Sequence, residues 1–285
     1  DYYLVTSTFA YFPGVPIFHS RDLVHWNQIG NILERKEQLP LVNAETSEGI
    51  FAPTLRYHDG TFYMITTNVT PTNDINNFIV TATDPAGPWS DPYPLDSAGI
   101  DPSLFFDDDG RVYIFYATGA LAELKSDLSG IKPDGVNMKI FERDEAENGL
   151  LEGSQVIKHN GKYYLLMISW PRNGIRREVC YRADKITGPY EKKVILEDAF
   201  DTYGGVGQGN IVDTPDGRWY GMMFQDRNGI GRVPTLMPCR WVDGWPMLGD
   251  EEGRVPLAME KPIQGYPETV SYTHLRAHET ELHLV

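Results

Sequence analysis

The sequence lacks any long hydrophobic run and has few cysteines. No stretch of about eighteen consecutive apolar residues occurs in the 285 residues, so no segment has the composition of a membrane-spanning helix, and we expect no membrane partner. Cys180 and Cys239 are the two cysteines, too few for a disulfide framework or a cysteine metal cluster. We expect both to be small buried side chains.

Positive charge is also scarce. The chain has 25 Lys and Arg against 40 Asp and Glu, which gives a formal net charge of −15. Nucleic-acid sites depend on Lys and Arg to neutralise phosphates, so this balance argues against a nucleic-acid partner. A neutral substrate is easier to accommodate.

Turns and aromatic residues, by contrast, are abundant and periodic. A Gly turn followed by an aromatic strand recurs at Gly60, Gly110, Gly161 and Gly217, at intervals of 50, 51 and 56 residues, and Asp1-Tyr2-Tyr3 fits as a fifth copy. Asp-Gly and Asn-Gly are typical of tight hairpins, and the interval is that of a four-stranded blade. The repeat predicts an all-β fold, a five-bladed β-propeller. A β-sandwich is the alternative, but it has no reason to repeat this signature.

The same repeat sets the expected domain organisation. We expect one propeller domain over residues 1–262, with its first strand missing because Asp1 aligns with the hairpin residue Thr61. Residues 263–269 are expected to be a linker or the start of a further region. Residues 270–285 are set aside, because ten residues from Ser271 to Thr280 match the translation of a common sequencing-library adapter.

Two carboxylates fall at equivalent positions of the repeat. Counting back eight residues from each turn, towards the axis, gives Phe51, Asp101, Glu152 and Gln208. The residues before both acids are apolar, and burial raises the pKa of a carboxyl group, as a general acid requires. The ordinary alternatives are a turn-capping Asp101 and a strand-edge Glu152. Equivalence in the repeat favours a paired catalytic role.

Around these acids, the motifs resemble glycoside hydrolase family 43, of the β-xylosidase or α-L-arabinofuranosidase type, up to about Gly249. They include 12–15 (FPGV), 19–26 (HSRDLVHW), 51–53 (FAP), 99–104 (GIDPSL) and Glu152-Gly153. The resemblance implies exo-acting, inverting hydrolysis of O-glycosidic bonds in oligosaccharides from xylan or arabinoxylan, with a pentose-containing oligosaccharide as the partner.

The resemblance also implies roles for individual residues. Glu152 would be the general acid, and Asp101 would orient it and tune its pKa. The general base would be an aspartate one strand before Tyr2, so we expect this chain to be an impaired hydrolase. Arg232 matches an arginine that reaches substrate hydroxyls; its alternative is a surface ion pair. Candidates for a sugar-facing wall, or else for core packing, are Phe9, Phe12, Phe51 and Trp170.

Gln208 bears on the cofactor prediction. It is a substrate-binding candidate, and it stands where many members of the resembled family carry a histidine that helps to hold calcium or a water cluster. We therefore expect no required cofactor and no metal ligands, although a structural calcium ion would fit the resemblance. The acidic run Asp107-Asp108-Asp109 lacks the ligand spacing of a calcium loop and is typical of a hairpin turn.

Other functions remain open from the sequence. An endo-arabinanase-like hydrolase would need an open groove, whereas residues 12–15 and 31–48 are predicted to form loops that wall a pocket. A non-catalytic carbohydrate-binding propeller would use the axial acids only for hydrogen bonds. The motifs of retaining fructan hydrolases are not found. The sequence does not distinguish xylose from arabinose.

Overall fold

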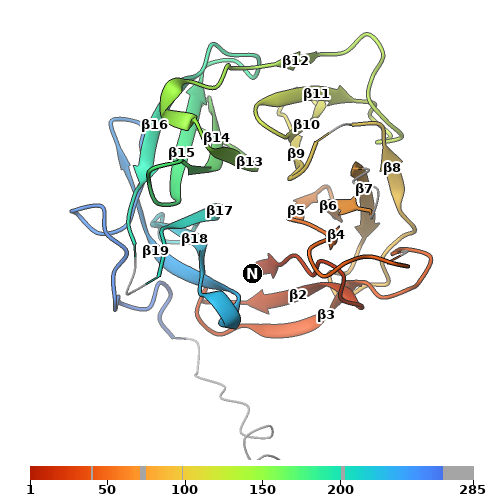
Figure 1. Ribbon diagram of the computed structural model, residues 1–285, viewed down its shortest axis with the longest axis horizontal. Helices are drawn as coiled ribbons and strands as arrows, with labels where there is room; N and C mark the ends of the chain where they lie inside the picture. Colours follow the sequence, from red (N-terminus) through yellow and green to blue (C-terminus); the bar gives the residue numbers. More distant parts are fainter. Residues whose placement is uncertain (40, 71–74, 98, 200–202, 266–285) are drawn as a thin grey trace, which may run out of the picture.

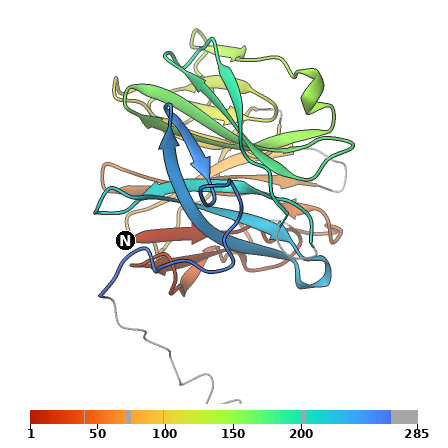
Figure 2. The same ribbon diagram turned by 90° about the vertical axis from the view of Figure 1, so that its left-hand side faces the viewer.

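The computed structural model describes residues 1–39, 41–70, 75–97, 99–199 and 203–265. Five sheets surround a central axis, with each successive sheet beside the last (Figures 1 and 2). The predicted five-bladed β-propeller is confirmed. Residues 270–285, set aside above, lie outside the described part of the chain. Within that part, no helix is long and apolar enough to span a membrane.

The strands follow the chain from blade to blade. The first sheet contains β1 (Tyr2–Val5), β2 (Gly14–Ser20) and β3 (Asn27–Leu33). The second contains β4 (Gly49–Ile50), β5 (Thr54–His58), β6 (Thr61–Val69), β7 (Ile75–Ala82) and β8 (Tyr93–Leu95). The third contains β9 (Ser103–Phe106), β10 (Val112–Tyr116), β11 (Ala120–Leu124) and β12 (Asn137–Lys139).

The last two blades complete the ring. The fourth contains β13 (Leu150–His159), β14 (Lys162–Trp170), β15 (Arg177–Ala183) and β16 (Glu191–Leu196), preceded by the 3₁₀ turn η1 (Glu145–Glu147). The fifth contains β17 (Val206–Asp213), β18 (Trp219–Asp226), β19 (Arg232–Val242) and β20 (Trp245–Leu248), with η2 (Asn228–Ile230) before β19. Paired strands within each sheet are antiparallel, as local hairpin connections require.

The repeated Gly turns join the inner strand of each blade to the next strand, in two different ways. Asp59-Gly60 and Asn160-Gly161 have both residues at positive φ and close two-residue hairpins. The turns at Gly110 and Gly217 are longer, and only the glycine has a positive φ. Only two of the four turns are therefore the tight two-residue hairpins that the Asp-Gly and Asn-Gly pairs indicate.

Hydrophobic cores lie between neighbouring blades. Four buried clusters lie one at each junction between consecutive blades, from the first and second blades to the fourth and fifth. Between the fifth and first blades the described residues instead leave a cavity of about 950 Å³, lined by side chains such as Leu4, Val5, Met222 and Leu236. Cys180 and Cys239 are buried and free, as expected. The ring is tied at this junction by Tyr2, whose hydroxyl donates to the Asp213 carbonyl at 3.0 Å.

Candidate active site

Asp101 lies just before β9 and is almost completely buried, with 4% of its surface exposed. Its φ of 55° turns the backbone so that the carboxylate crosses to the fourth blade, where Oδ2 accepts the Gly153 N–H at 2.9 Å. Burial, reinforced by the charge of Glu152, raises the pKa of Asp101 to about 7. The Gly153 hydrogen bond and the charge of Arg232 oppose this shift.

Glu152 is half-buried in β13, at a bulge that breaks the register between Glu152 and Gln155. Burial raises its pKa, while the positive charges of Arg232, Arg176 and Arg143 act in the opposite direction. A bulge of this kind re-aims a side chain out of the ladder. The two acids that the repeat places at equivalent positions are therefore electrostatic neighbours near the axis.

Gly153 allows this packing because a larger residue would not fit. Its φ is +77°, and a Cβ atom there would lie 2.9 Å from Cγ of Gln208. Gln208 in turn has a φ of 55° at the bulge of β17, and its Nε2 approaches Asp101 Oδ2 at 3.5 Å. Gln208 therefore belongs to the same cluster as the two acids.

Arg232 and the aromatic residues border this cluster. Arg232 begins β19, and its guanidinium lies over Phe9 at 5.6 Å and over Phe224 at 4.8 Å. Phe9 and Phe51 pack edge to face at 5.6 Å. Trp170 is 44% exposed at the end of β14. Phe12 is 49% exposed, and the structure shows no aromatic or hydrogen-bonded contact between its side chain and the cluster.

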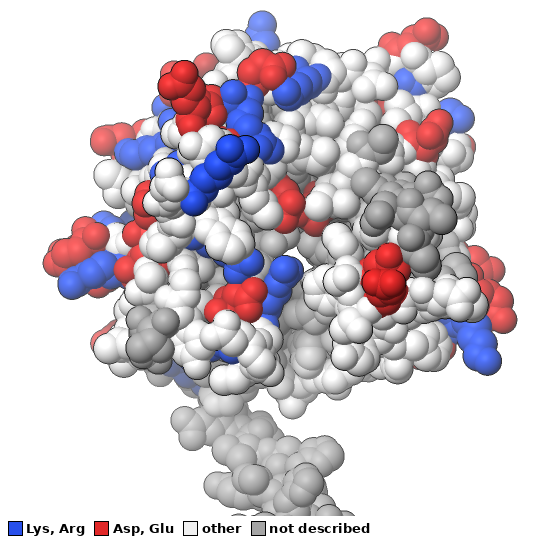
Figure 3. All heavy atoms as spheres, viewed as in Figure 1, with Lys and Arg blue, Asp and Glu red and all other residues white. Residues whose placement is uncertain are grey.

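Some of these residues line the cavity beside the cluster. Phe9, Gln208 and Arg232 line it, whereas Asp101 and Glu152 do not, and neither do Phe12, Phe51 or Trp170. Among the described residues, the carboxylate that lines it is Asp226, which forms an ion pair with Arg176 at 3.1 Å. Figure 3 shows acidic side chains beside the central hollow and basic side chains on the fourth blade near it.

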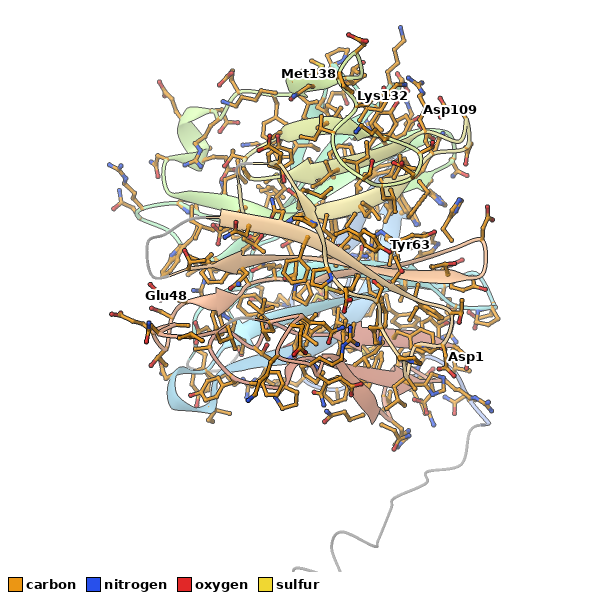
Figure 4. The ribbon with its side chains drawn as sticks, turned by 90° about the vertical axis from the view of Figure 1, so that its right-hand side faces the viewer. Asp1, Glu48, Tyr63, Asp109, Lys132 and Met138 are labelled. Atoms are coloured by element: carbon orange, nitrogen blue, oxygen red, sulfur yellow. The ribbon has the colours of Figure 1, made fainter. Side chains whose placement is uncertain are left out.

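Asp1 lies elsewhere. Its Oδ1 is 2.9 Å from His19 Nε2, and its side chain is 54% exposed. In Figure 4, Asp1 and the hairpin residue Asp109 lie at the same side of the molecule, opposite Glu48. This placement agrees with the alignment of Asp1 with a hairpin position, away from the axial acids.

The described residues contain no group of three or more His, Cys, Asp or Glu side chains positioned to hold a metal ion. Asp107, in the acidic run, is buried and bonded to Lys158 and Tyr163 at 2.6 and 2.7 Å. The side-chain NH₂ group of Gln208 lies 3.5 Å from Asp101 Oδ2. The prediction that no cofactor is required stays a prediction.

The sequence reasoning missed Glu178, Arg176 and Phe224. Glu178 in β15 has no exposed surface, and its Oε2 accepts the Gln208 backbone N–H at 2.7 Å. Burial raises the pKa of Glu178 to about 8. Phe224 lies between the guanidinium groups of Arg176 and Arg232. An acid followed by the apolar run Val179-Cys180-Tyr181 was the available signal for Glu178.

Comparison with known proteins gives a consistent family. The model of "Glycosyl hydrolases family 43" matches residues 1–246. A xylosidase/arabinosidase of Butyrivibrio fibrisolvens is 39% identical over 303 residues, covering 93% of this chain and 56% of that protein. A non-reducing end α-L-arabinofuranosidase of Bacteroides ovatus is 37% identical, covering 88% of this chain and 50% of that protein.

Solved structures agree with the sequence matches. The GH43 protein BlXynB from Bacillus licheniformis superimposes with a TM-score of 0.81 at 31% identity, covering 94% of this chain and 56% of that protein. A bifunctional GH43-CE protein from Bacteroides eggerthii gives a TM-score of 0.80 at 40% identity, covering 93% and 35%. The chain spans about half the length of the curated relatives it matches.

Proposed function

The chain belongs to glycosyl hydrolase family 43, and from this premise we propose that it cleaves O-glycosidic bonds in xylan- or arabinoxylan-derived oligosaccharides, releasing terminal pentose units with inversion. The names of the Butyrivibrio and Bacteroides relatives support xylose and arabinofuranose as the candidate sugars. The sequence arguments for a walled pocket support exo action.

One observation carries this proposal: the buried Asp101 of the third blade and the half-buried Glu152 of the fourth both have a raised pKa and interact electrostatically. A carboxyl group that keeps its proton near neutral pH can protonate a leaving glycosidic oxygen. We assign this role to Glu152, since it is the more exposed of the two. Asp101, held by the Gly153 N–H, positions Glu152 and is coupled to it as a like charge.

Arg232 and Gln208 complete the proposed pentose site. Both line the cavity, and Arg232 presents N–H donors that sugar hydroxyls can accept. Phe9 offers an apolar wall beneath that guanidinium. We therefore place the terminal pentose against Gln208 and Arg232, and the leaving group beyond Glu152, which does not line the cavity.

Inversion also requires a base that activates water on the far face of the sugar. Asp101 and Glu152 are neighbours on one side of the site, and Asp226 is held in its ion pair with Arg176. We therefore propose that this chain hydrolyses glycosides slowly. An anionic nucleophile that needs no deprotonation should substitute for the activated water.

Azide tests this proposal with the chain as it stands. Its terminal nitrogen would bond to the anomeric carbon as the bond from that carbon to the glycosidic oxygen breaks, and Glu152 would give its proton to that oxygen. We expect azide-dependent release of phenol from a phenyl pentoside and a glycosyl azide of inverted configuration. Glu152→Gln should lower this rate about 10²- to 10⁴-fold, with little loss for a dinitrophenyl leaving group, which needs no proton.

The controls separate the alternatives. Glu37→Gln changes an exposed loop carboxylate and should keep the azide-dependent rate. An endo-arabinanase-like enzyme would cleave internal bonds of long arabinan and leave aryl pentosides intact. A carbohydrate-binding propeller would bind oligosaccharide without any azide-dependent product. Equal rates for Glu152→Gln and the unchanged chain on the phenyl pentoside would remove Glu152 from the acid role.

A further inference from the structure

Two arginines that do not line the cavity, Arg143 and Arg172, contact the segment just before Glu152. Arg143 donates to the Gly149 carbonyl and, at 3.2 Å, to Thr118 Oγ1, and its charge acts on Glu152. Arg172 follows β14, and its backbone N–H donates to Asn148 Oδ1 at 2.9 Å. Both arginines are exposed and border the segment that leads into β13 and Glu152. In Figure 3, basic side chains gather on this blade beside the hollow.

These two arginines have no carboxylate partner among the described residues, although acids are close in the sequence. Three of the four acids at 142–147 have cations of their own: Glu142 pairs with Lys139, Asp144 with Lys192, and Glu147 with Arg177 and Lys192. The exposed Glu145 is the fourth. In a chain of net charge −15, two arginines without a carboxylate partner at the segment that leads into β13 are a local excess of positive charge.

Trp170 provides a fixed aromatic surface in the same place. It pairs with Leu150 across β13 and β14, two residues along β13 from Glu152. Its Nε1 donates to the Gly174 carbonyl at 3.2 Å, and Arg176 lies over its ring at 4.5 Å. Arg176 is itself held by Asp226 at 3.1 Å. The exposed part of the indole is therefore held in place, and a sugar ring can stack on it.

The position of this group relative to Glu152 indicates its ligand, if the proposed function holds. Gln208 and Arg232, which line the cavity, are assigned to the terminal pentose, so we place the leaving group towards Trp170, Arg143 and Arg172, none of which lines it. Guanidinium groups select carboxylates, with which they form charge-assisted hydrogen bonds. We infer that these three residues form a leaving-group site for a sugar that bears a carboxylate, such as a uronic acid substituent on a xylan backbone.

Matched ligands test this inference on the whole chain. Isothermal titration calorimetry would compare xylotriose with xylobiose that carries one glucuronic acid, which has the same number of sugar units. We expect the acidic trisaccharide to bind about fivefold more tightly at low salt, as two exposed ion pairs allow. The preference should disappear at about 0.5 M NaCl, where exposed charges are screened.

Variants test whether the preference for the acidic trisaccharide depends on these arginines. R143Q/R172Q should bind both trisaccharides equally, and R172Q alone should lose part of the preference while leaving the Arg143 bonds to the backbone intact. Arg254→Gln removes an arginine that is exposed on the segment after β20, and it should keep the full preference. Trp170→Ala should weaken binding of both trisaccharides, because stacking does not depend on charge.

The outcomes distinguish this inference from the proposed function. Equal affinity for the two trisaccharides, or an acidic preference that survives in R143Q/R172Q, would overturn the leaving-group site and leave the pentose site standing. Failure of both trisaccharides to bind would overturn the proposed function and the inference together.

Discussion

At the scale of single residues, the site depends on carboxyl groups whose pKa the fold raises. Asp101, Glu152 and Glu178 all have a raised pKa, with burial as the largest cause of each shift. Asp101 and Glu152 interact with each other, so their protons titrate as a pair. Glu178 contacts the cluster through the backbone of Gln208, whose N–H donates to the Glu178 carboxylate.

The Asp101 and Glu152 coupling predicts a shifted pH profile. Asp101→Asn keeps an oxygen for the Gly153 N–H but removes the titrating partner of Glu152; the charge of Glu152 raises the pKa of Asp101, and a like-charge interaction acts on both acids. The alkaline limb of azide-supported activity should therefore move to lower pH, by about one unit for a neighbouring like charge. Asp84→Asn, at an outer turn, is the control. An alkaline limb that stays in place would contradict the coupling.

Glu178 predicts a pH-dependent stability difference. Its folded-state pKa of about 8 lies above the unfolded value, so the folded state loses stability as pH rises from the unfolded pKa to about 8. Glu178→Gln removes this pH-dependent loss. Its free energy of unfolding in urea, relative to that of the unchanged chain, should therefore increase between pH 5 and 8. Glu178→Leu also removes the acceptor of the Gln208 N–H, which costs about 1–3 kcal/mol. A pH-independent difference for Glu178→Gln would contradict the assigned pKa.

At the scale of secondary-structure elements, strand bulges bring the site together. β13 loses register just after Glu152, which still pairs with Ile168, and β17 loses register at Gln208. Gly153 follows Glu152, and Gln208 lies between two glycines, of which Gly209 could not carry a Cβ because it would lie 1.9 Å from the Met222 carbonyl oxygen. The strands hold the bulges rigidly because their remaining residues pair with β14 and β18.

A pair of glycine variants separates the site from the fold. Gly153→Ala and Gly161→Ala both place alanine at a φ near +75°, which should cost about 1–2 kcal/mol of unfolding free energy in each. Only at Gly153 does the new Cβ meet Gln208, since nothing lies within 4 Å of the Gly161 position. Azide-supported activity should therefore fall in Gly153→Ala alone. Similar activity in the two variants would show that Gln208 need not hold its place.

At the scale of the whole molecule, the junction of the fifth and first blades differs from the other four. The cavity replaces a buried cluster there, and polar contacts tie the ring. Lys261, on the segment after β20, reaches Asp22 of the first blade at 2.7 Å. Arg218 of the fifth blade donates to the Pro262 carbonyl at 2.6 Å.

Removing the contact between Lys261 and Asp22 should destabilise the junction of the fifth and first blades. Lys261→Met removes one partner of the buried Asp22 carboxylate, which keeps its bonds to His25 and to backbone N–H groups. We therefore expect the free energy of unfolding, measured in urea at pH 7, to fall by about 1–3 kcal/mol. Burial acts to raise the pKa of Asp22, but the bond to Lys261 and the other hydrogen bonds hold it well below its usual range. The ionised Asp22 therefore stabilises the fold above its unfolded pKa, and this stabilisation fades as the pH falls below that value.

Lys36→Met is the matched control, because Lys36 is exposed on the loop after β3. The two variants should differ at pH 7 and converge near the acid limit of folding. Equal stability of both variants at pH 7 would show that the closure does not depend on Lys261.

The sequence by itself determined the propeller and its axial residues. Both follow from local signals: Gly turns that fix hairpins, and a repeat that places one residue of each blade near the axis. Counting along the chain therefore found Asp101, Glu152 and Gln208 without knowledge of their neighbours. It could not show that Phe12 lies exposed without a contact to them.

Only the tertiary structure decided which side chains meet across blades. Three contacts join segments whose spacing follows no repeat: Glu178 with the Gln208 backbone, Phe224 with Arg176 and Arg232, and the charge of Arg143 with Glu152. Strand alternation tells which face of a blade a residue occupies, but not which residue of the next blade it touches. That contact depends on how the blades twist and pack, and the pKa shifts that define the site arise from this packing.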